Sequence, residues 1–127
     1  MIDSVSNGMR FGRIAAMLPV ADMARAHDFY ADALGLTKTF QNGTPVGFMI
    51  LKRDDAELHL TLQPGHKPAP FNVAHMMVED IDAVHAIIRT RGLRIVKGLR
   101  DKDYGLRAFV FEDSDGNRSD VGEPLKT

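Results

Sequence analysis

The sequence of 127 residues contains no cysteine and no tryptophan. The missing cysteines exclude disulfides, thiolate nucleophiles and cysteine-ligated zinc or iron–sulfur sites. Basic and acidic residues balance, at 16 against 17, and no cluster of lysine and arginine occurs, so there is no electrostatic reason to expect nucleic acid. No apolar run is long enough to span a membrane, and MIDSVSNGMR at 1–10 lacks the apolar core of a signal peptide. We therefore expect a cytoplasmic protein without nucleic-acid or membrane partners.

The chain does contain an internal repeat. Its length and its 44% apolar content are typical of one globular domain, expected over 1–127. The repeat predicts two modules in this domain, at about 13–63 and 71–124, joined by a proline-rich linker at 64–70. Four residues of the first half recur 58 positions later: Val20 as Val78, Asp22 as Asp80, His27 as His85, and Gly47 as Gly105.

Each module is predicted to contain one strand, one helix and three further strands. Asp22 is expected to cap the first helix and Gly35 to end it, because apolar residues recur at helical spacing between them. Asp80 or Asp82 is expected to cap the second helix, and Gly92 to end it. A hairpin turn is expected at 113–116, and strands at 14–20, 37–40, 46–52, 57–63, 73–78, 94–98, 106–112 and 117–122.

Two βαβββ modules side by side give an α+β fold with a curved mixed sheet and a cleft. In ELHLTLQ at 57–63, leucines alternate with polar residues. One face of this strand is therefore expected to pack under a helix, while His59 and Thr61 on the other face line the cleft. Such a cleft is a typical place for a small-molecule pocket.

The order of elements resembles that of the vicinal-oxygen-chelate superfamily, as do LPVADMARAHDFYADALGL at 18–36 and EDSDGNRSDVGE at 112–123. That superfamily includes glyoxalase I, extradiol dioxygenases, fosfomycin-resistance enzymes and bleomycin-resistance proteins. ILKRDDAELHLTLQPG at 50–65 and DYGLRAFVFEDSDGNRSDVGE at 103–123 are most similar to the bleomycin-resistance branch. Proteins of that branch are dimers that sequester cationic glycopeptide drugs without catalysis. The resemblance implies a homodimer that binds a small molecule and confers antibiotic resistance.

The resemblance also implies where the enzymes of the superfamily hold their metal. The four ligand positions correspond to Ala15, His59, Val73 and Asp120. Alanine and valine cannot bind a metal, and a typical zinc site takes at least three protein ligands. His75 offers a further donor, but it is expected about 7 Å along the strand from the family position. We therefore expect no catalytic residue and no metal cofactor.

The candidate ligand-binding residues lie on the strands predicted to line the cleft or on the turns beside them. Arg107 is expected to pair with Asp120. Glu57, Asp120 and Glu123 are expected to supply the local acid that a cationic drug requires. The full candidate set is His59, Asp120, Phe40, Phe48, Tyr104, Arg107, Thr61 and His75.

Two alternatives stay open. One is a divalent-metal lyase, isomerase or dioxygenase, in which Zn, Ni, Mn or Fe between His59 and Asp120 acts as a Lewis acid. The other is a family member with a vestigial pocket that serves as a regulatory or immunity module. The arrangement of the dimer, with modules side by side or swapped between chains, is open as well.

Overall fold

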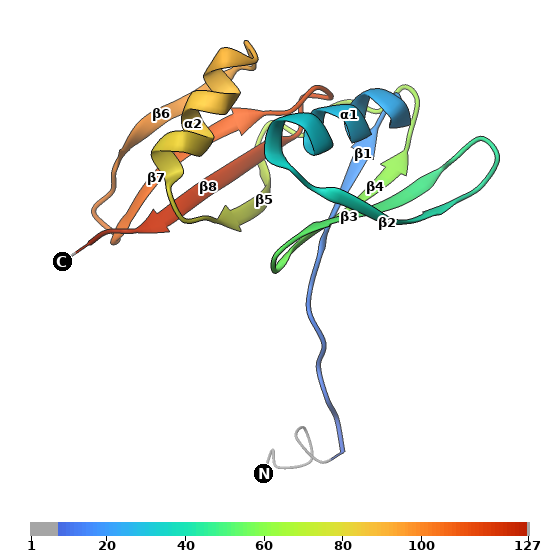
Figure 1. The fold of residues 1–127 in the computed structure, drawn as a ribbon, viewed down its shortest axis with the longest axis horizontal. Helices are drawn as coiled ribbons and strands as arrows, with labels where there is room; N and C mark the ends of the chain where they lie inside the picture. Colours follow the sequence, from blue (N-terminus) through green and yellow to red (C-terminus); the bar gives the residue numbers. More distant parts are fainter. Residues whose placement is uncertain (1–7, 127) are drawn as a thin grey trace.

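The computed structural model describes residues 8–126, which follow the predicted order of elements twice (Figure 1). The first module consists of β1 (Ala16–Val20), α1 (Met23–Leu34), β2 (Thr37–Asn42), β3 (Phe48–Arg53) and β4 (Ala56–Leu62). The second module consists of β5 (Asn72–Met77), α2 (Ile81–Thr90), β6 (Ile95–Asp101), β7 (Leu106–Glu112) and β8 (Arg118–Pro124). Neither helix has the length and apolar character needed to cross a membrane within these residues.

The strands form two four-stranded mixed sheets, one in each module. The strand order is β1-β4-β3-β2 in the first sheet and β5-β8-β7-β6 in the second. In each sheet the first pair of strands is parallel and the others are antiparallel. The edge strands β1 and β5 contact each other where the modules meet. This arrangement confirms the α+β fold of tandem βαβββ modules, with the strands divided between two sheets.

The two helices begin in different ways. The Asp22 side chain accepts a hydrogen bond of 3.0 Å from the backbone N–H of Arg25, so the predicted cap of α1 is confirmed. Asp80 occupies the cap position of α2, but its side chain makes no capping hydrogen bond. Instead, both carboxylate oxygens of Glu123 accept hydrogen bonds from the backbone, at 2.9 Å from Asp80 and 3.1 Å from Ile81. Asp80 is thus the residue at which α2 begins, as predicted, but Glu123 of β8 rather than Asp80 accepts the hydrogen bonds from the free N–H groups.

One hydrophobic core joins the two modules. The ring of Phe29 in α1 lies 4.8 Å from that of Tyr30 and 6.3 Å from that of Phe111 in β7, so contact between the modules is aromatic. Each sheet turns one face towards this core, and Figure 1 shows the two helices on the same side of the sheets. The other face of each sheet is not covered by a helix. Fully buried core residues come from both modules and include Leu18, Leu51, Leu60, Ile81, Ile88, Phe109 and Val121.

The predicted hairpin turn joins β7 to β8 and also ties the modules together. Asp115 accepts a 2.9 Å hydrogen bond from the backbone N–H of Ala21, in the first module. The Asn117 side-chain amide donates at 2.9 Å to the carbonyl of Pro19. Both polar side chains are buried, so these bonds between the modules replace bonds to water. The turn thus fixes how the second module sits against β1 and α1.

Candidate functional site

The uncovered face of the first sheet carries four of the predicted site residues. His59 on β4 pairs with Ile50 on β3, which pairs with Phe40 on β2. Thr61 pairs with Phe48 in the same way. Because directly opposed residues in a sheet point to the same side, these side chains share one face. We call this face the first open face.

The aromatic rings on the first open face form a continuous row. The centroids of Phe40 and Phe48 are 6.1 Å apart, and those of Phe48 and His59 are 5.4 Å apart. The planes are inclined by 62° and 86°, which is edge-to-face packing. Phe40 keeps 50% of its surface exposed although it is large and apolar. The row therefore offers an aromatic surface to which a further ring can be added.

His59 is held in place by Glu57, which lies on the same face. The ring nitrogen Nε2 of His59 is 2.6 Å from Oε2 of Glu57. The other oxygen of Glu57 binds Arg13, and it lies 3.4 Å from Nζ of Lys52. These contacts, led by the hydrogen bond to His59, lower the pKa of Glu57 from 4.5 to about 2. Glu57 therefore stays ionised, and its charge is already matched by its own neighbours.

Arg13 and Lys52 were not found by sequence reasoning. Lys52 pairs with Glu57 across β3 and β4, and this register could not be known before the strands were placed. Arg13 precedes β1 in a stretch without regular secondary structure, where no periodicity marks it. The sequence signal for Lys52 was its even spacing from Phe48 and Ile50 along one strand.

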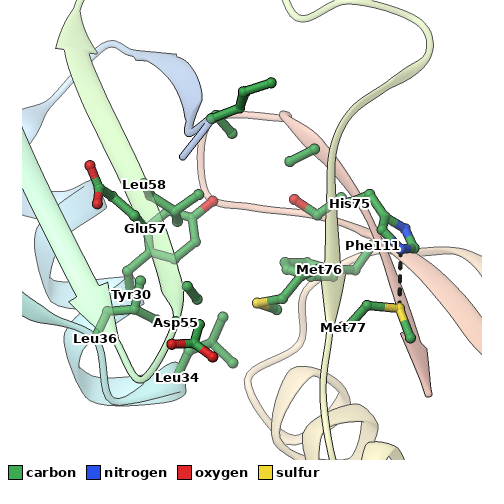
Figure 2. A pocket seen from close by; sticks show the side chains of 15 residues that line it. Tyr30, Leu34, Leu36, Asp55, Glu57, Leu58, His75, Met76, Met77 and Phe111 are labelled. Atoms are coloured by element: carbon green, nitrogen blue, oxygen red, sulfur yellow. Dashed lines mark hydrogen bonds between the residues drawn. The ribbon is translucent and has the colours of Figure 1, made fainter. Parts of the chain in front are cut away.

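The uncovered face of the second sheet brings His75 and Asp120 together. Nδ1 of His75 is 2.7 Å from Oδ2 of Asp120, and Nε2 is 3.2 Å from Sδ of Met77. Figure 2 shows His75 and Met77 side by side on β5, on the opposite side of the strand from Met76. We call this face, which also carries Val110 opposite Asp120, the second open face.

The contact between His75 and Asp120 depends on an irregularity in the pairing of β5 with β8. A register shift between Asn72 and Ala74 means that β5 has one extra residue relative to β8 at this point: Asn72 is opposite Arg118, but Ala74 is opposite Ser119. His75, rather than Ala74, then becomes the direct partner of Asp120. A bulge of this kind leaves no clear mark in one sequence, so the contact between His75 and Asp120 was not predicted.

His59 and Asp120 do not form a common site within the described chain. They lie in different sheets, and each has a hydrogen-bonded partner in its own sheet. No group of three or more His, Cys, Asp or Glu side chains is arranged to hold a metal ion anywhere in 8–126. Each histidine–carboxylate pair offers only two donors, whereas a catalytic zinc centre takes three from protein. The residues present do not fit the metal centre of the enzymes in this superfamily.

Arg107 lies on the helix-covered face of its sheet, so the expected pairing with Asp120 is wrong. Its guanidinium donates hydrogen bonds of 2.9 Å to Asp82 in α2 and 3.0 Å to Asp101 in β6. These bonds raise the pKa of Arg107, the bond to Asp82 most of all. Asp120 lies on the opposite face of the sheet from Arg107, and its register partner on β7 is Val110. Tyr104 lies in the turn between β6 and β7, outside the strands that form the two open faces, and is 62% exposed.

The acid expected at the cleft is also arranged differently. Glu57 is bound by three neighbours and Asp120 by His75, as described above. Glu123 points to the other side of its sheet, where the N–H groups of α2 lower its pKa. Neither open face therefore carries an acid that is unpaired among residues 8–126.

A groove of about 300 Å³ lies between the modules (Figure 2). Its walls are mainly apolar and come from both modules, with Tyr30, Leu58, Met76 and Phe111 among them. Of the predicted site residues, only His75 lies along it. The aromatic row and Asp120 therefore belong to the open faces rather than to this groove.

The comparison with protein families matches residues 10–121 to the Glyoxalase/Bleomycin resistance protein/Dioxygenase superfamily. The chain belongs to this superfamily, as its resemblance predicted. Among proteins with curated functions, no match was found.

Solved structures share the fold over most of the chain. A superfamily member from Sphaerobacter thermophilus is 27% identical, with a TM-score of 0.75 over 89% of this chain and 98% of its own. A bleomycin resistance determinant encoded on transposon Tn5 is 21% identical, with a TM-score of 0.76 over 91% of this chain and 100% of its own. TnmS3, an antibiotic binding protein from Streptomyces sp., is 24% identical, with a TM-score of 0.72 over 92% and 99%. The last two likenesses establish the fold alone.

Proposed function

We propose that this protein binds a planar aromatic drug or metabolite and sequesters it without making or breaking a bond. The observation that carries this proposal is the row formed by Phe40, Phe48 and His59 on an open sheet face. A further ring added to such a row gains stacking or edge-to-face energy in addition to buried area. The names of two structural relatives, a bleomycin resistance determinant and an antibiotic binding protein, support a ligand of this kind.

The site is proposed to be completed by a second copy of the chain. Phe40, Phe48 and His59 line neither the groove between the modules nor the second pocket, which lies beside α1, β2 and β3, and ligand sites normally bury most of their ligand. Apolar side chains remain exposed along the junction of the sheets, including Ile14 at 98%, Met17 at 62% and Met77 at 47%. Exposed apolar groups gathered at sheet edges are typical of a protein–protein contact. Two copies meeting there would bring their open faces together.

The proposed function includes no cofactor and a cytoplasmic location. The donor pairs described above are too small for a catalytic metal centre. The absence of cysteine is compatible with the reducing conditions of the cytoplasm.

The binding proposal is tested by calorimetry and thermal shift with bleomycin and with planar aromatic compounds such as 2-naphthoate. We expect at least one to raise the melting temperature of the wild type. Phe40→Ala should weaken that binding by about fivefold, because an aromatic contact contributes on the order of 1 kcal/mol. Ile87→Ala, at an exposed position on α2, should leave it unchanged. Failure of every compound to bind would contradict the proposal.

The dimer is tested separately by sedimentation velocity. We expect a homodimer for the wild type and a monomer for Met17→Asp, because a charge is placed in an apolar contact. Ile87→Asp is the matched control and should remain dimeric. A monomeric wild type would contradict the proposed completion of the site.

A further inference from the structure

The charges on the two open faces differ from those of the whole chain. The sequence carries a net charge of −1. Among residues 8–126, the only acid on the first open face is Glu57, and it contacts Arg13 and Lys52 as well as His59. With His59 neutral, this face has one cation more than it has anions. A local excess of this kind determines which ligands approach more than the net charge does.

The second open face has a larger excess of positive charge. Its acids are Glu112 and Asp120. Glu112 accepts hydrogen bonds from Arg94 at 3.2 Å and Arg118 at 3.1 Å, and Asp120 pairs with His75. No carboxylate on this face is left to attract a cationic ligand.

Two further cations on this face have no acid beside them. Lys97 is the register partner of Val110, and Arg100 is the partner of Ala108, so both side chains point to the face of Asp120. Both residues are exposed, and neither forms an ion pair with another residue in 8–126. Their charges are therefore available to a ligand.

On the basis of the proposed function, we propose that the site selects aromatic anions and that Lys97 and Arg100 determine this selectivity. The ring of the ligand lies on the aromatic row of one open face. Its carboxylate or phenolate group is directed to the two unpaired cations on the second open face of the partner copy. Charge complementarity favours such an anion, and it disfavours cationic drugs because no unpaired carboxylate meets them.

The test uses three probes of one shape: 2-naphthoate, the neutral 2-naphthamide and the cationic 2-naphthylmethylammonium. Calorimetry at low salt should show 2-naphthoate binding roughly five- to tenfold more tightly than the amide, with the ammonium probe weakest, since each exposed ion pair contributes modestly. The preference should shrink as salt is raised, because exposed charges are screened.

The double variant Lys97→Gln/Arg100→Gln should bind the acid and the amide equally. Arg89→Gln/Arg91→Gln removes the same charge at exposed positions at the end of α2, which covers the other side of the sheet, and should keep the preference. Equal binding of acid and amide by the wild type overturns the inference but leaves aromatic binding intact. Tighter binding of the ammonium probe, or a preference retained in the Lys97/Arg100 variant, overturns it as well. Failure of all three probes to bind contradicts this inference together with the proposed function.

Discussion

The Tyr30 hydroxyl of α1 donates a hydrogen bond of 2.5 Å to Oδ2 of Asp113, at the start of the turn between β7 and β8. Both residues are buried, and they come from different modules. The other oxygen of Asp113 accepts bonds of 2.8 Å and 2.9 Å from the backbone N–H groups of Asp115 and Asn117. Burial raises the pKa of Asp113 and, together with the nearby carboxylate, that of Tyr30. One carboxylate thus organises the turn and anchors it to α1.

Removal of this hydroxyl should destabilise the whole domain. In Tyr30→Phe, Oδ2 of Asp113 loses its shortest hydrogen bond and keeps only the 3.3 Å bond from the Asn117 amide, while the ring contacts remain. We expect a decrease of about 1–3 kcal/mol in the free energy of unfolding, the usual effect of removing a hydrogen bond to a buried carboxyl group. Urea denaturation measures it, with Tyr104→Phe at an exposed position as the control. Equal stability of the two variants would show that the bond between the modules contributes nothing.

The cap of α2 gives a second prediction. Glu123→Ala removes the acceptor for two backbone N–H groups at the start of the helix, and we expect a loss of roughly 0.5–2 kcal/mol in unfolding free energy. Asp80→Asn should cost less, because that side chain makes no capping bond and asparagine tolerates the left-handed backbone at this position. Thermal and urea unfolding of both variants provide the comparison. A larger loss in the Asp80 variant would reverse the assignment of the cap.

The helices and strands of this fold could be predicted because local sequence patterns mark them. Asp22 and Gly35 mark the two ends of α1, and the observed helix lies between them. The predicted strand at 106–112 coincides with β7, and alternation in 57–63 correctly separated His59 and Thr61 from the leucines. Such patterns depend only on neighbours in sequence.

The missed features depend on contacts between distant segments. The His75–Asp120 contact requires a bulge in β5, and the cap of α2 comes from a strand about forty residues away. The face on which Arg107 lies could have been predicted, because the alternation of a strand places it on the same side as the buried Phe109 and Phe111. The partners of Arg107 could not be predicted, because they come from α2 and β6, and the packing of those elements against β7 leaves no mark in the local sequence. Local patterns thus defined the elements, and the pairing of elements decided the site.

Metal binding provides a third prediction. We expect Zn²⁺, Ni²⁺ and Fe²⁺ to bind more weakly than micromolar in calorimetry, because each open face supplies one histidine and one hydrogen-bonded carboxylate. His59→Ala and Asp120→Ala should then change the weak signal little. Tight binding that both variants abolish would show that the two open faces combine into one metal centre, and it would restore the enzymatic alternative.

Glu57 should make the stability of the protein depend on pH in the acid range. Its pKa in the folded protein, about 2, lies below the ordinary value of 4.5. A carboxylate with a lowered pKa stabilises the folded state fully above 4.5, and this contribution is lost as the pH falls from 4.5 towards 2. We therefore expect the difference in unfolding free energy between wild type and Glu57→Gln to be largest near neutral pH and to shrink over that interval. Glu79→Gln, at an exposed position, is the control and should show no such convergence. Added salt should reduce the effect, because the partners Arg13 and Lys52 are partly exposed. A difference that stays constant between neutral pH and pH 2 would mean that the contacts of Glu57 do not favour its ionised form.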